Sequence, residues 1–391
     1  MKLAATLMPD IDFAWHDVPN LRELVNTLRE QGPVVPVVYH GKPVWLMTRH
    51  DTVRDAFADE EHFASEAAYR VHSEPSMGHT LQCMSGDIHR VNRALVSKPF
   101  FPKQIRDKVE AAIEPEARRW LERIADRPEA DLVQAYSRPF PFSVITRLLG
   151  IPVHDEQLFM EWAVKLIDYP WDPEGALAAR AGFDAYMLPL MARRRLDPGD
   201  DVVSILATAE VEGQQLSDEE ILAFCRLIFP AGSDTTYKNL GSLLYAVLSD
   251  PDLRAQAAAG DAEREAIVQE GLRWEPPTAL LPRRCSKTID FHGVTIEKDD
   301  WLLFGITAAN NDPSVFPQPE RFDPSRPNKN LAFGHGVHFC LGSHLARREL
   351  ETALKVLLER YPDIALCDDR PVEIIGGALR GPRELWVRPH G

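Results

Sequence analysis

The spacing of hydrophobic residues is helical over most of the chain and alternating in short stretches near both ends. In the first sixty residues it predicts helices at 21–30 and 51–58 and strands at 34–39 and 44–47. From about residue 88 to residue 271 the helical pattern dominates, with proline or glycine interruptions near 139–141, 150–152, 170–173 and 198–199. We therefore expect a mainly α protein.

The pattern changes after Trp274. Pro276 and Pro277 end a helix there, strand-like runs follow at 290–296 and 301–306, and a proline-rich irregular segment covers 312–327. Both ends of the chain thus contribute to a smaller β-rich part beside a large helical body. Because no internal repeat or low-complexity linker separates the two parts, residues 1–391 are expected to form a single domain.

Two long helices are predicted beyond the middle of the chain. Ser217 and Glu220 have the spacing of a capping box, and the apolar period that follows predicts a helix over 221–249. At 1.5 Å per residue, such a helix is about 45 Å long and can cross the whole domain. Pro230 and Gly232 lie inside it, so a local opening is expected there. A second, amphipathic helix is predicted over 343–361.

The composition is acidic, with 59 Asp and Glu against 44 Lys and Arg and a net charge of −15, which argues against nucleic acid as a general partner. No run approaches the roughly 18 apolar residues of a membrane span, and residues 1–20 lack the pattern of a signal peptide. The cysteines are odd in number and have no CxxC spacing, so neither a disulfide framework nor a zinc site is expected. A reducing cytoplasm fits best. These cysteines are Cys83, Cys225, Cys285, Cys340 and Cys367.

Only Cys340 has surroundings that suggest more than a buried free thiol. It follows a glycine-rich loop that contains Gly334 and Gly336, and it precedes the predicted helix that starts near Ser343. A helix N-terminus and free N–H groups favour a thiolate, so we expect a lowered thiol pKa and a potential metal ligand. Cysteine and glycines alone would still favour a buried thiol at the start of a core helix.

The ten residues from Phe333 to Gly342 match Phe-Gly-x-Gly-x-His-x-Cys-x-Gly at every specified position. This segment resembles the haem-binding signature of the cytochrome P450 family. The resemblance implies the P450 fold, one haem b per chain with Cys340 as the iron ligand, and haem contacts from Phe333, Gly334 and Gly342. It extends from about residue 32 to residue 386, with five motifs in the family's order.

Inside the first long helix, the segment from Ala231 to Thr236 resembles the family's oxygen-activation motif. The resemblance implies that Thr235 and Asp234 act in oxygen activation, with Asp234 supplying protons, and that Ala231 and Gly232 leave room above the haem. Without the resemblance, the preferred interpretation is that Thr235 bonds back to its own helix and Asp234 faces solvent.

Three further sets of residues follow from the resemblance. Glu270, Arg273 and Arg321, in Glu-x-x-Arg and Pro-Glu-Arg-Phe patterns, are implied to form a buried structural ion network. The haem carboxylates are implied to bind His89, Arg93, Arg283 and His338, with Arg284 as a less favoured substitute for Arg283. The substrate regions are implied near 64–84, 158–190, 228–231, 278–281 and 376–379, with candidate contacts Thr278, Ala279, Leu280, Leu281, Ile228 and Ala378.

The function implied is a monooxygenase that inserts one oxygen atom from O2 into a hydrophobic small molecule. No flavin or iron–sulfur pattern follows Cys340, so electrons from NAD(P)H are expected through a separate ferredoxin and its reductase. The ferredoxin is expected to dock on basic residues near the cysteine, namely Arg93, Lys98, Lys103, Arg106, Arg347 and Arg348. A monomer without a membrane partner is expected. Two alternatives remain: a peroxide-driven peroxygenase, which the Asp234–Thr235 pair disfavours, and a non-catalytic haem sensor.

Overall fold

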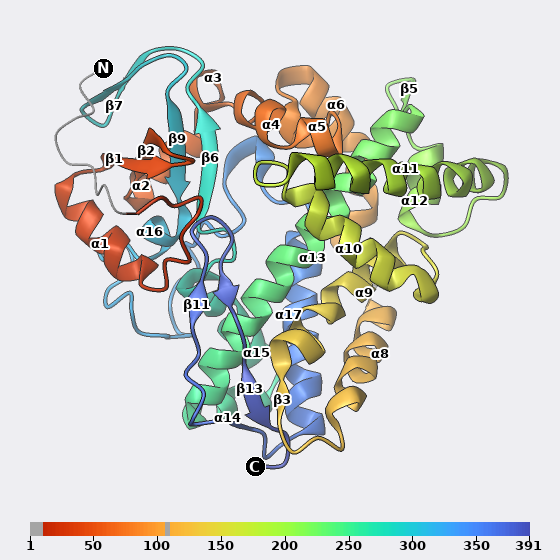
Figure 1. Cartoon of the computed structure of the whole chain (residues 1–391), viewed down its shortest axis with the longest axis vertical. Coiled ribbons are helices and arrows are strands. Elements are labelled where there is room, and N and C mark those ends of the chain that lie inside the picture. The colour runs from red at the N-terminus through yellow and green to blue at the C-terminus, as the bar shows by residue number, and fades with distance from the viewer. Residues whose placement is uncertain (1–10, 106–109) are drawn as a thin grey trace.

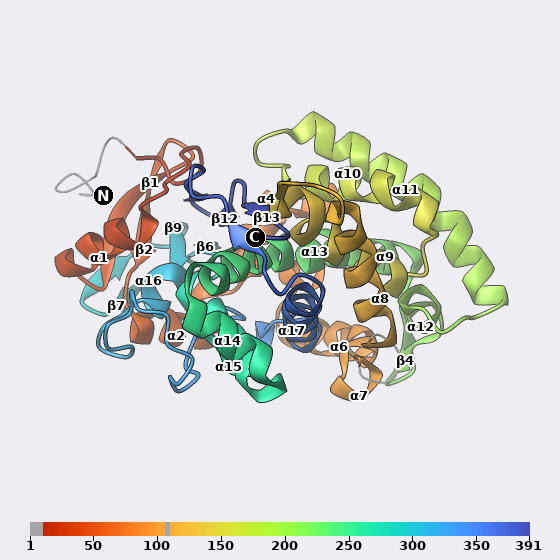
Figure 2. The same ribbon diagram turned by 90° about the horizontal axis from the view of Figure 1, so that it is seen from below.

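A computed structural model describes residues 11–105 and 110–391. The helical body is built around α13 (Asp218–Ser249) and α17 (Ser343–Arg360), which contact each other near its centre (Figures 1 and 2). The helices around them are α6 (Gly86–Ser97), α8 (Glu110–Leu121), α9 (Pro139–Leu148), α10 (Glu156–Ile167), α11 (Pro173–Leu196), α12 (Val202–Thr208), α14 (Pro251–Ala259) and α15 (Asp261–Trp274).

The β-rich part is a four-stranded sheet with the order β1-β2-β9-β6, formed by β1 (Val34–Tyr39), β2 (Lys42–Met47), β9 (Trp301–Gly305) and β6 (Leu280–Arg284). The pair β2 and β9 is parallel and joins the two ends of the chain, whereas the other pairs are antiparallel. Helices α1 (Leu21–Gln31), α2 (His50–Ala58) and α16 (Ile306–Asn310) lie beside this sheet (Figure 1). The predicted contribution of both ends to one β-rich part is confirmed.

Short elements complete the described chain. The small helices are α3 (Glu60–Phe63), α4 (Glu66–His72), α5 (Glu74–Met77) and α7 (Pro102–Gln104), with single turns at Leu81–Cys83, Lys98–Phe100, Glu122–Ile124, Val133–Ser137, Val153–Asp155 and Gly336–His338. The small sheets pair β10 (Ala365–Leu366), β13 (Trp386–Arg388) and β3 (Ala130–Asp131); β11 (Ile374–Ile375) and β12 (Gly381–Pro382); β4 (Glu210–Val211) and β5 (Gln214–Gln215); and β7 (Ile289–Phe291) and β8 (Val294–Ile296). The run predicted as one strand over 290–296 is thus the hairpin β7–β8, turning at Gly293 with φ +83°.

Helix α13 begins as predicted. The Ser217 hydroxyl accepts from the Glu220 backbone N–H, and the Glu220 carboxylate accepts from the Ser217 backbone N–H, which completes a capping box. Helix α13 continues through Pro230 and runs from Asp218 to Ser249, so the local opening expected there does not end the helix. Hydroxyl groups after the proline bond to carbonyls four residues earlier, a pattern that bends helices without ending them. These bonds join Ser233 to Phe229, Thr235 to Ala231 and Thr236 to Gly232.

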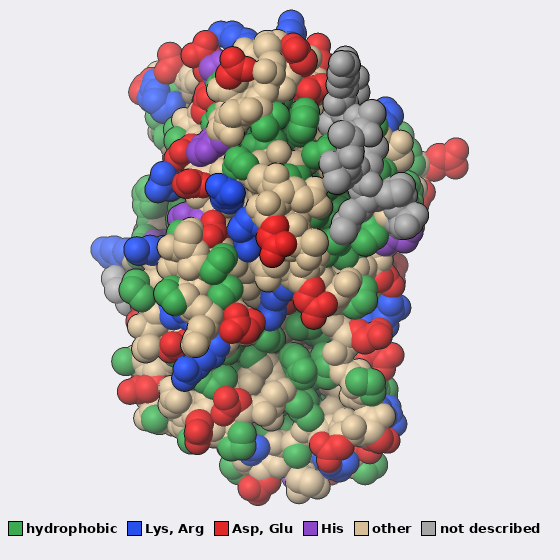
Figure 3. Space-filling model, turned by 90° about the vertical axis from the view of Figure 1, so that its left-hand side faces the viewer, with side chains coloured by type: hydrophobic (Ala, Val, Ile, Leu, Met, Phe, Trp, Pro, Cys, Tyr) green, Lys and Arg blue, Asp and Glu red, His purple; other side chains and the backbone are tan. Residues whose placement is uncertain are grey.

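Although the net charge of the chain is negative, acidic and basic side chains are intermixed on the face near α1 and the four-stranded sheet (Figure 3). Of the helices in the described ranges, none is long and apolar enough to cross a membrane. Residues 1–10, which belong to the segment in which no signal peptide was expected, lie outside the described residues.

Candidate active site

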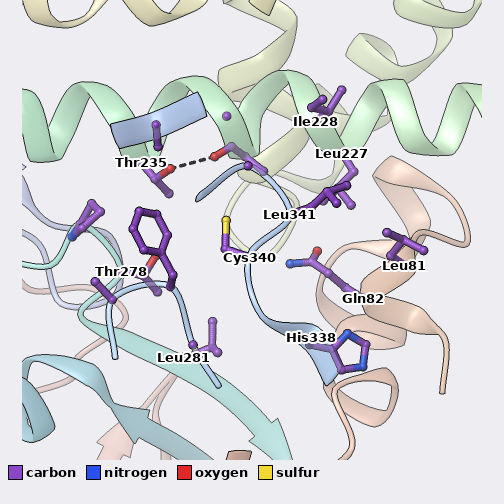
Figure 4. A pocket seen from close by; sticks show the side chains of 18 of the residues that line it. Leu81, Gln82, Leu227, Ile228, Thr235, Thr278, Leu281, His338, Cys340 and Leu341 are labelled. Carbon is purple, nitrogen blue, oxygen red and sulfur yellow. Dashed lines mark hydrogen bonds between the residues drawn. The ribbon is translucent and has the colours of Figure 1, made fainter. Parts of the chain in front are cut away.

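A cavity of about 290 Å³ lies between α13, α17, the loop before α17, strand β6 and the segment around α4 and Leu81–Cys83. Its wall is mostly apolar, and the sulfur of Cys340 points into it toward α13 (Figure 4). The cavity therefore brings together the cysteine loop and the oxygen-activation motif, which are more than 100 residues apart in the sequence.

The loop that carries Cys340 is shaped by backbone contacts. The Cys340 N–H donates to the Phe333 carbonyl at 2.9 Å, which closes the loop ahead of α17. Gly336 has φ +75°, and a Cβ there would lie 2.9 Å from the Phe57 carbonyl oxygen, so a side chain at this position would be both strained and crowded. Gly342 is the N-cap of α17, two residues beyond the sulfur.

Burial raises the pKa of the Cys340 thiol, although the Gly342 N–H and the guanidinium groups of Arg93 and Arg347 act in the opposite direction. The expectation of a lowered thiol pKa is therefore wrong for the protein alone. The physical reason is that the sulfur faces a mostly apolar cavity, where a charged thiolate is poorly solvated. A metal cation at the sulfur would reverse this balance, because a coordinating thiol is deprotonated by the metal.

Four nitrogen-bearing side chains converge beside the cysteine loop. The rings of His89 and His338 are 4.0 Å apart, and Arg93 donates to the Phe339 carbonyl at 2.5 Å. Arg283, from β6, is buried and lines the same cavity as Arg93 and His338. Burial, followed by His89 and the two arginines, lowers the pKa of His338 to about 3.

This cluster has little counter-charge of its own. Glu60 is 3.4 Å from the His338 Nε2, and the buried His89 Nε2 has no hydrogen-bond partner within the described part of the chain. Buried polar groups without partners are rare, so a donor or acceptor from a bound group is expected there. A flat molecule with two carboxylates, facing Cys340, meets both requirements, and the residues present therefore fit haem. Arg284 does not belong to this set, because it pairs with Asp299 at 3.0 Å.

On the α13 wall, Thr235 lines the cavity and its hydroxyl donates to the Ala231 carbonyl at 2.8 Å (Figure 4). Asp234 is buried and is not among the residues that line the cavity. Both of its carboxylate oxygens accept from Lys238 Nζ at 2.8 Å. The threonine thus bonds back to its helix, whereas the aspartate is held by a cation on the same helix instead of facing solvent.

Gly232 lines the cavity, as expected, and also has a packing role. A Cβ at this position would lie 2.8 Å from Ile145 Cδ1, so its absence allows α13 to pack closely on α9. Ala231, the neighbouring small residue, is exposed to the cavity. Both small residues that were predicted to leave space thus line the cavity.

Sequence reasoning missed one ionisable residue of the cavity wall. Glu349 on α17 is 1% exposed, and neither of its carboxylate oxygens has a hydrogen-bond partner among the described residues. Burial raises its pKa well above the ordinary value, and Thr236 beside it opposes this only in part. The available signal was a glutamate at a core-facing position of the amphipathic helix 343–361, between apolar neighbours such as Leu345 and Leu350.

The ion network near α15 differs from the prediction in one member. Arg273 and Glu270 form a buried bidentate pair with distances of 2.9 and 2.7 Å. Arg326 supplies the second guanidinium, 3.3 Å from Glu270, so the prediction of Arg321 is wrong. Arg321 offers only its backbone carbonyl, which accepts from Arg273 at 3.1 Å. The irregular segment turns its later arginine inward, where Arg326 also donates to the Pro317 and Gln318 carbonyls.

Only some of the candidate substrate contacts line the cavity. Thr278, Leu281 and Ile228 line the cavity, together with Leu81 and Gln82 from the predicted region 64–84 (Figure 4). The expected contacts Ala279, Leu280 and Ala378 do not. Leu280 points to the opposite face of the strand from Leu281, and the Ala378 carbonyl accepts from the Ala279 N–H at 2.8 Å. None of the cavity-lining residues comes from the predicted region 158–190 in the part of the chain described.

Comparison with known proteins gives consistent matches. The family model described as cytochrome P450 matches residues 264–376. Erythromycin C-12 hydroxylase from Saccharopolyspora erythraea is 36% identical over 95% of each chain. Steroid C26-monooxygenase from Mycobacterium tuberculosis is 30% identical over 95% of this chain and 96% of that protein. The solved structure of the cytochrome P450 PksS from the Bacillus subtilis 168 bacillaene polyketide synthase superposes with a TM-score of 0.88, at 29% identity, over 95% of this chain and 97% of the other.

Proposed function

The chain belongs to the cytochrome P450 family and is a haem-thiolate monooxygenase. On this premise we propose that Cys340 binds the haem iron. We also propose that a neutral, hydrophobic molecule binds in the cavity above Cys340 and is oxidised there. The observation that carries the proposal is the cavity itself. Cys340 faces it from one side, and the His89, Arg93, Arg283 and His338 cluster borders the same loop with little counter-charge. This arrangement is suited to a flat dianion with an iron centre.

The haem, when bound, supplies a site for O2 and a path for electrons. The overall reaction takes O2, the substrate R–H, two electrons and two protons, and releases R–OH and water. In this reaction the chain holds the cofactor through Cys340 and the cationic cluster, encloses the substrate, and supplies protons from the α13 side. Thr235 is one of two threonines of the motif that line the cavity, and we assign it the positioning of a proton there.

We assign Asp234 the role of a proton source, and its ion pair with Lys238 must open before it can act. Its two oxygens, each 2.8 Å from the lysine Nζ, are held outside the cavity lining. Exchange of this ion pair, or a rotation of the aspartate, is therefore needed before it can serve Thr235.

The substrate class follows from the apolar side chains above Cys340. Leu81, Leu227, Ile228 and Leu281 line this space, and Gln82 and Thr278 add neutral polar groups. A ligand there is held mainly by burial of apolar surface, with a small number of hydrogen bonds for orientation. The names of the two relatives specify erythromycin and a steroid, so this class of chain acts on large and dissimilar molecules, and the identity of the substrate has to be determined by binding.

For the electron supply we propose a ferredoxin with its NAD(P)H-dependent reductase. Lys98 and Lys103 are exposed just after α6, whose Arg93 contacts the cysteine loop, and the side chains of Val337 and Phe339 are 51% and 39% exposed on that loop. Arg347 stacks on Phe333 with 4.5 Å from its guanidinium carbon to the ring centroid, and Arg348 pairs with Glu351 at 2.6 Å. Arg106, also predicted in this set, lies outside the described residues. A face with positive charge around apolar contacts suits an acidic partner protein.

The decisive test of the ligand assignment replaces the Cys340 thiol with a hydroxyl group of similar shape. Cys340→Ser should abolish the red-shifted Soret band of the reduced carbon monoxide complex, because a hydroxyl does not replace a thiolate ligand. Cys225→Ser, which changes a buried cysteine outside the cavity lining, should keep the band. A normal thiolate spectrum in Cys340→Ser would contradict the ligand assignment.

The alternatives are separated by turnover. A monooxygenase forms product from O2, NAD(P)H and redox proteins, whereas a peroxygenase forms it efficiently from peroxide alone and a sensor forms none. Reduction by an acidic ferredoxin should slow as salt rises, since screening weakens the steering of opposite charges. Rates that do not depend on ionic strength would contradict the docking proposal.

A further inference from the structure

A groove on the outer surface of the helical body is separate from the cavity that Cys340 faces. It has a volume of about 700 Å³ and lies between the end of α8, the start of α9, α10 and the start of α11. These helices are on the other side of the helical body from the four-stranded sheet (Figures 1 and 2). In the part of the chain described, the groove and the cavity share no lining residue.

Two tryptophans give this groove an apolar wall whose shape is fixed by the contacts behind it. The Trp120 N–H donates to the Ser143 hydroxyl at 2.7 Å. Trp162 packs against α11 at Gly182, where a Cβ would lie 2.9 Å from its ring. A preformed apolar surface is stabilised when a hydrophobic group covers it, which favours an occupant with an apolar body. The other apolar lining residues are Pro139, Met160, Val164, Ala178 and Ala179.

The polar rim of the groove carries two arginines without a counter-charge. Arg123 stacks on the Trp120 ring, 4.1 Å from its guanidinium carbon to the ring centroid, and forms no ion pair with the described residues. Arg138, half-buried ahead of α9, also has no ion pair within the described ranges, and its Nε is buried without a hydrogen-bond partner. Arg119, which also stacks on Trp120, is by contrast held by two carboxylates. Because partly buried charges are usually paired, the two free guanidinium groups favour an anion from outside the chain.

The other charged residues of the groove set the charge of that anion. Lys165 Nζ is paired with Asp172 at 2.6 Å, so this lysine adds little to the positive field. Glu161, which accepts from Gln157 at 3.1 Å, offsets one of the two arginines. The lining therefore has a surplus of one positive charge, which suits an occupant with a single negative charge.

We propose that the groove is a binding site for a free long-chain carboxylate, in which Arg123 and Arg138 bind the carboxylate and the apolar chain covers Trp120 and Trp162. A carboxylate carries one charge and accepts parallel hydrogen bonds from a guanidinium group, so it matches both the charge and the donors of the rim. The site goes beyond the proposed monooxygenase function, because its ligand lies outside the cavity of Cys340 and is not oxidised there.

The test measures the binding of dodecanoate, below its micelle concentration, to the haem-loaded protein by calorimetry. Because the apolar cavity above Cys340 can also take up this molecule, that cavity is first filled with phenylimidazole, whose binding shifts the haem absorption band. One dodecanoate per chain should still bind. Arg123→Gln/Arg138→Gln should weaken this binding about tenfold or more, since the hydrogen bonds to the carboxylate are charge-assisted. The matched control is Arg118→Gln, at an exposed arginine of α8 outside the groove lining, and should bind as the unaltered protein does.

Two further measurements locate the ligand and separate the contributions of its charge and its chain. A terminally brominated dodecanoate should quench tryptophan fluorescence, because bromine quenches a nearby indole, and Trp162→Phe should remove part of that quenching. Trp15→Phe, which changes a tryptophan that is 58% exposed and outside the groove lining, should leave the quenching unchanged. Dodecyltrimethylammonium, which has the same apolar chain and a positive charge, should bind about tenfold or more weakly.

Equal affinity of the double variant and the unaltered protein would overturn the proposal, as would equal affinity for the cationic probe, which would indicate apolar adsorption only. Loss of all dodecanoate binding when phenylimidazole fills the cavity would show binding above the haem only, and would also overturn it. If the double variant does not fold, Arg123→Gln and Arg138→Gln are measured singly, and unchanged affinity in both would contradict the proposal. None of these outcomes bears on the thiolate spectrum or on product formation, so the groove site and the proposed function can fail separately.

Discussion

At the scale of single residues, the contacts of Thr235 and Asp234 differ in part from those that an isolated Asp-Thr pair suggests. The hydroxyl bonds back to the Ala231 carbonyl, as an isolated threonine in a helix would, yet it also lines the cavity that Cys340 faces. Asp234 is buried against Lys238, four residues later on the same helix. The motif predicted a role in proton supply, which stays a prediction, and it did not predict the lysine that holds the acid in place.

We predict that Thr235→Ala keeps the fold and the haem but uncouples electron use from product formation. The alanine removes the hydroxyl from the cavity wall without adding bulk, and a positioned proton-transfer group contributes roughly 100-fold or more to such steps. Product per NAD(P)H should therefore fall by roughly ten- to a hundredfold, with peroxide as the main product of O2. Thr235→Ser, which keeps the hydroxyl, should retain most of the coupling. Equal coupling in Thr235→Ala and the unaltered enzyme would remove Thr235 from the proton path.

The motifs predicted several of the residues that line the cavity, among them Cys340 and Thr235, but not several side-chain partners. Arg326, and not Arg321, reaches Glu270, because the irregular segment 312–327 sets the direction of each side chain through turns that no periodic pattern describes. Side chains alternate between the two faces of β6, so Leu281 and Arg283 line the cavity and Leu280 does not. The apolar run 278–281 alone did not predict this difference.

At the scale of elements, the helices were predicted most closely. The capping box and the apolar period give α13 within three residues of its observed start and at its observed end, and α17 likewise within one residue. The parallel pairing of β2 with β9, which joins residues near 46 to residues near 303, could not be derived from a local period. The uninterrupted course of α13 through Pro230 was not predicted either, because it depends on tertiary packing that a local period does not describe.

The contact between α13 and α9 gives an element-scale prediction. Gly232→Ala places a methyl 2.8 Å from Ile145 Cδ1, and overpacking of this kind costs roughly 1–3 kcal/mol, partly offset by the better helix propensity of alanine. Ile145→Val removes that terminal methyl, so the double variant should be more stable than the sum of the single effects by about 1 kcal/mol. Urea unfolding of the four proteins measures this coupling.

The control for this cycle is Gly271→Ala on α15, where the new methyl would lie 2.8 Å from Leu243 Cδ1. Ile145→Val leaves that contact unchanged, so it should not rescue Gly271→Ala. Additive effects of Gly232→Ala and Ile145→Val would mean that α9 can move away and that the glycine is not needed for close approach.

At the scale of the whole molecule, a cluster of aromatic and histidine side chains joins parts of the chain that are distant in sequence. We call Trp15, Tyr39, His40, His72, Trp171 and Trp301 the histidine cluster. His40, in the β1–β2 turn, lies 5.2 Å from Trp171 in the connection between α10 and α11, and 6.1 Å from His72 at the end of α4. His72 in turn meets Trp301 of β9 at 4.9 Å. The cluster thus connects the four-stranded sheet to α4 and to the connection between α10 and α11.

The cluster makes the stability of the whole molecule depend on pH. Burial, followed by His40, lowers the pKa of His72 from 6.5 to about 4, and burial also lowers the pKa of His40, against the attraction of Asp12 and with a further lowering by Lys42. Because both folded-state pKa values are depressed, the unfolded chain binds more protons below pH 6.5. The stability present above that pH is therefore lost as the pH falls toward 4.

We predict that His72→Phe, which keeps a ring of similar shape, reduces this loss. Between pH 7 and pH 5 the unaltered protein should lose roughly 2 kcal/mol more than His72→Phe, since each unit of pKa difference corresponds to about 1.4 kcal/mol. His154→Gln, at a side chain that is 80% exposed, serves as the control and should follow the unaltered protein. Thermal unfolding at several pH values measures both. Identical acid dependence in His72→Phe and the unaltered protein would mean that His72 becomes solvated before the body and the sheet separate, and that the cluster does not couple them.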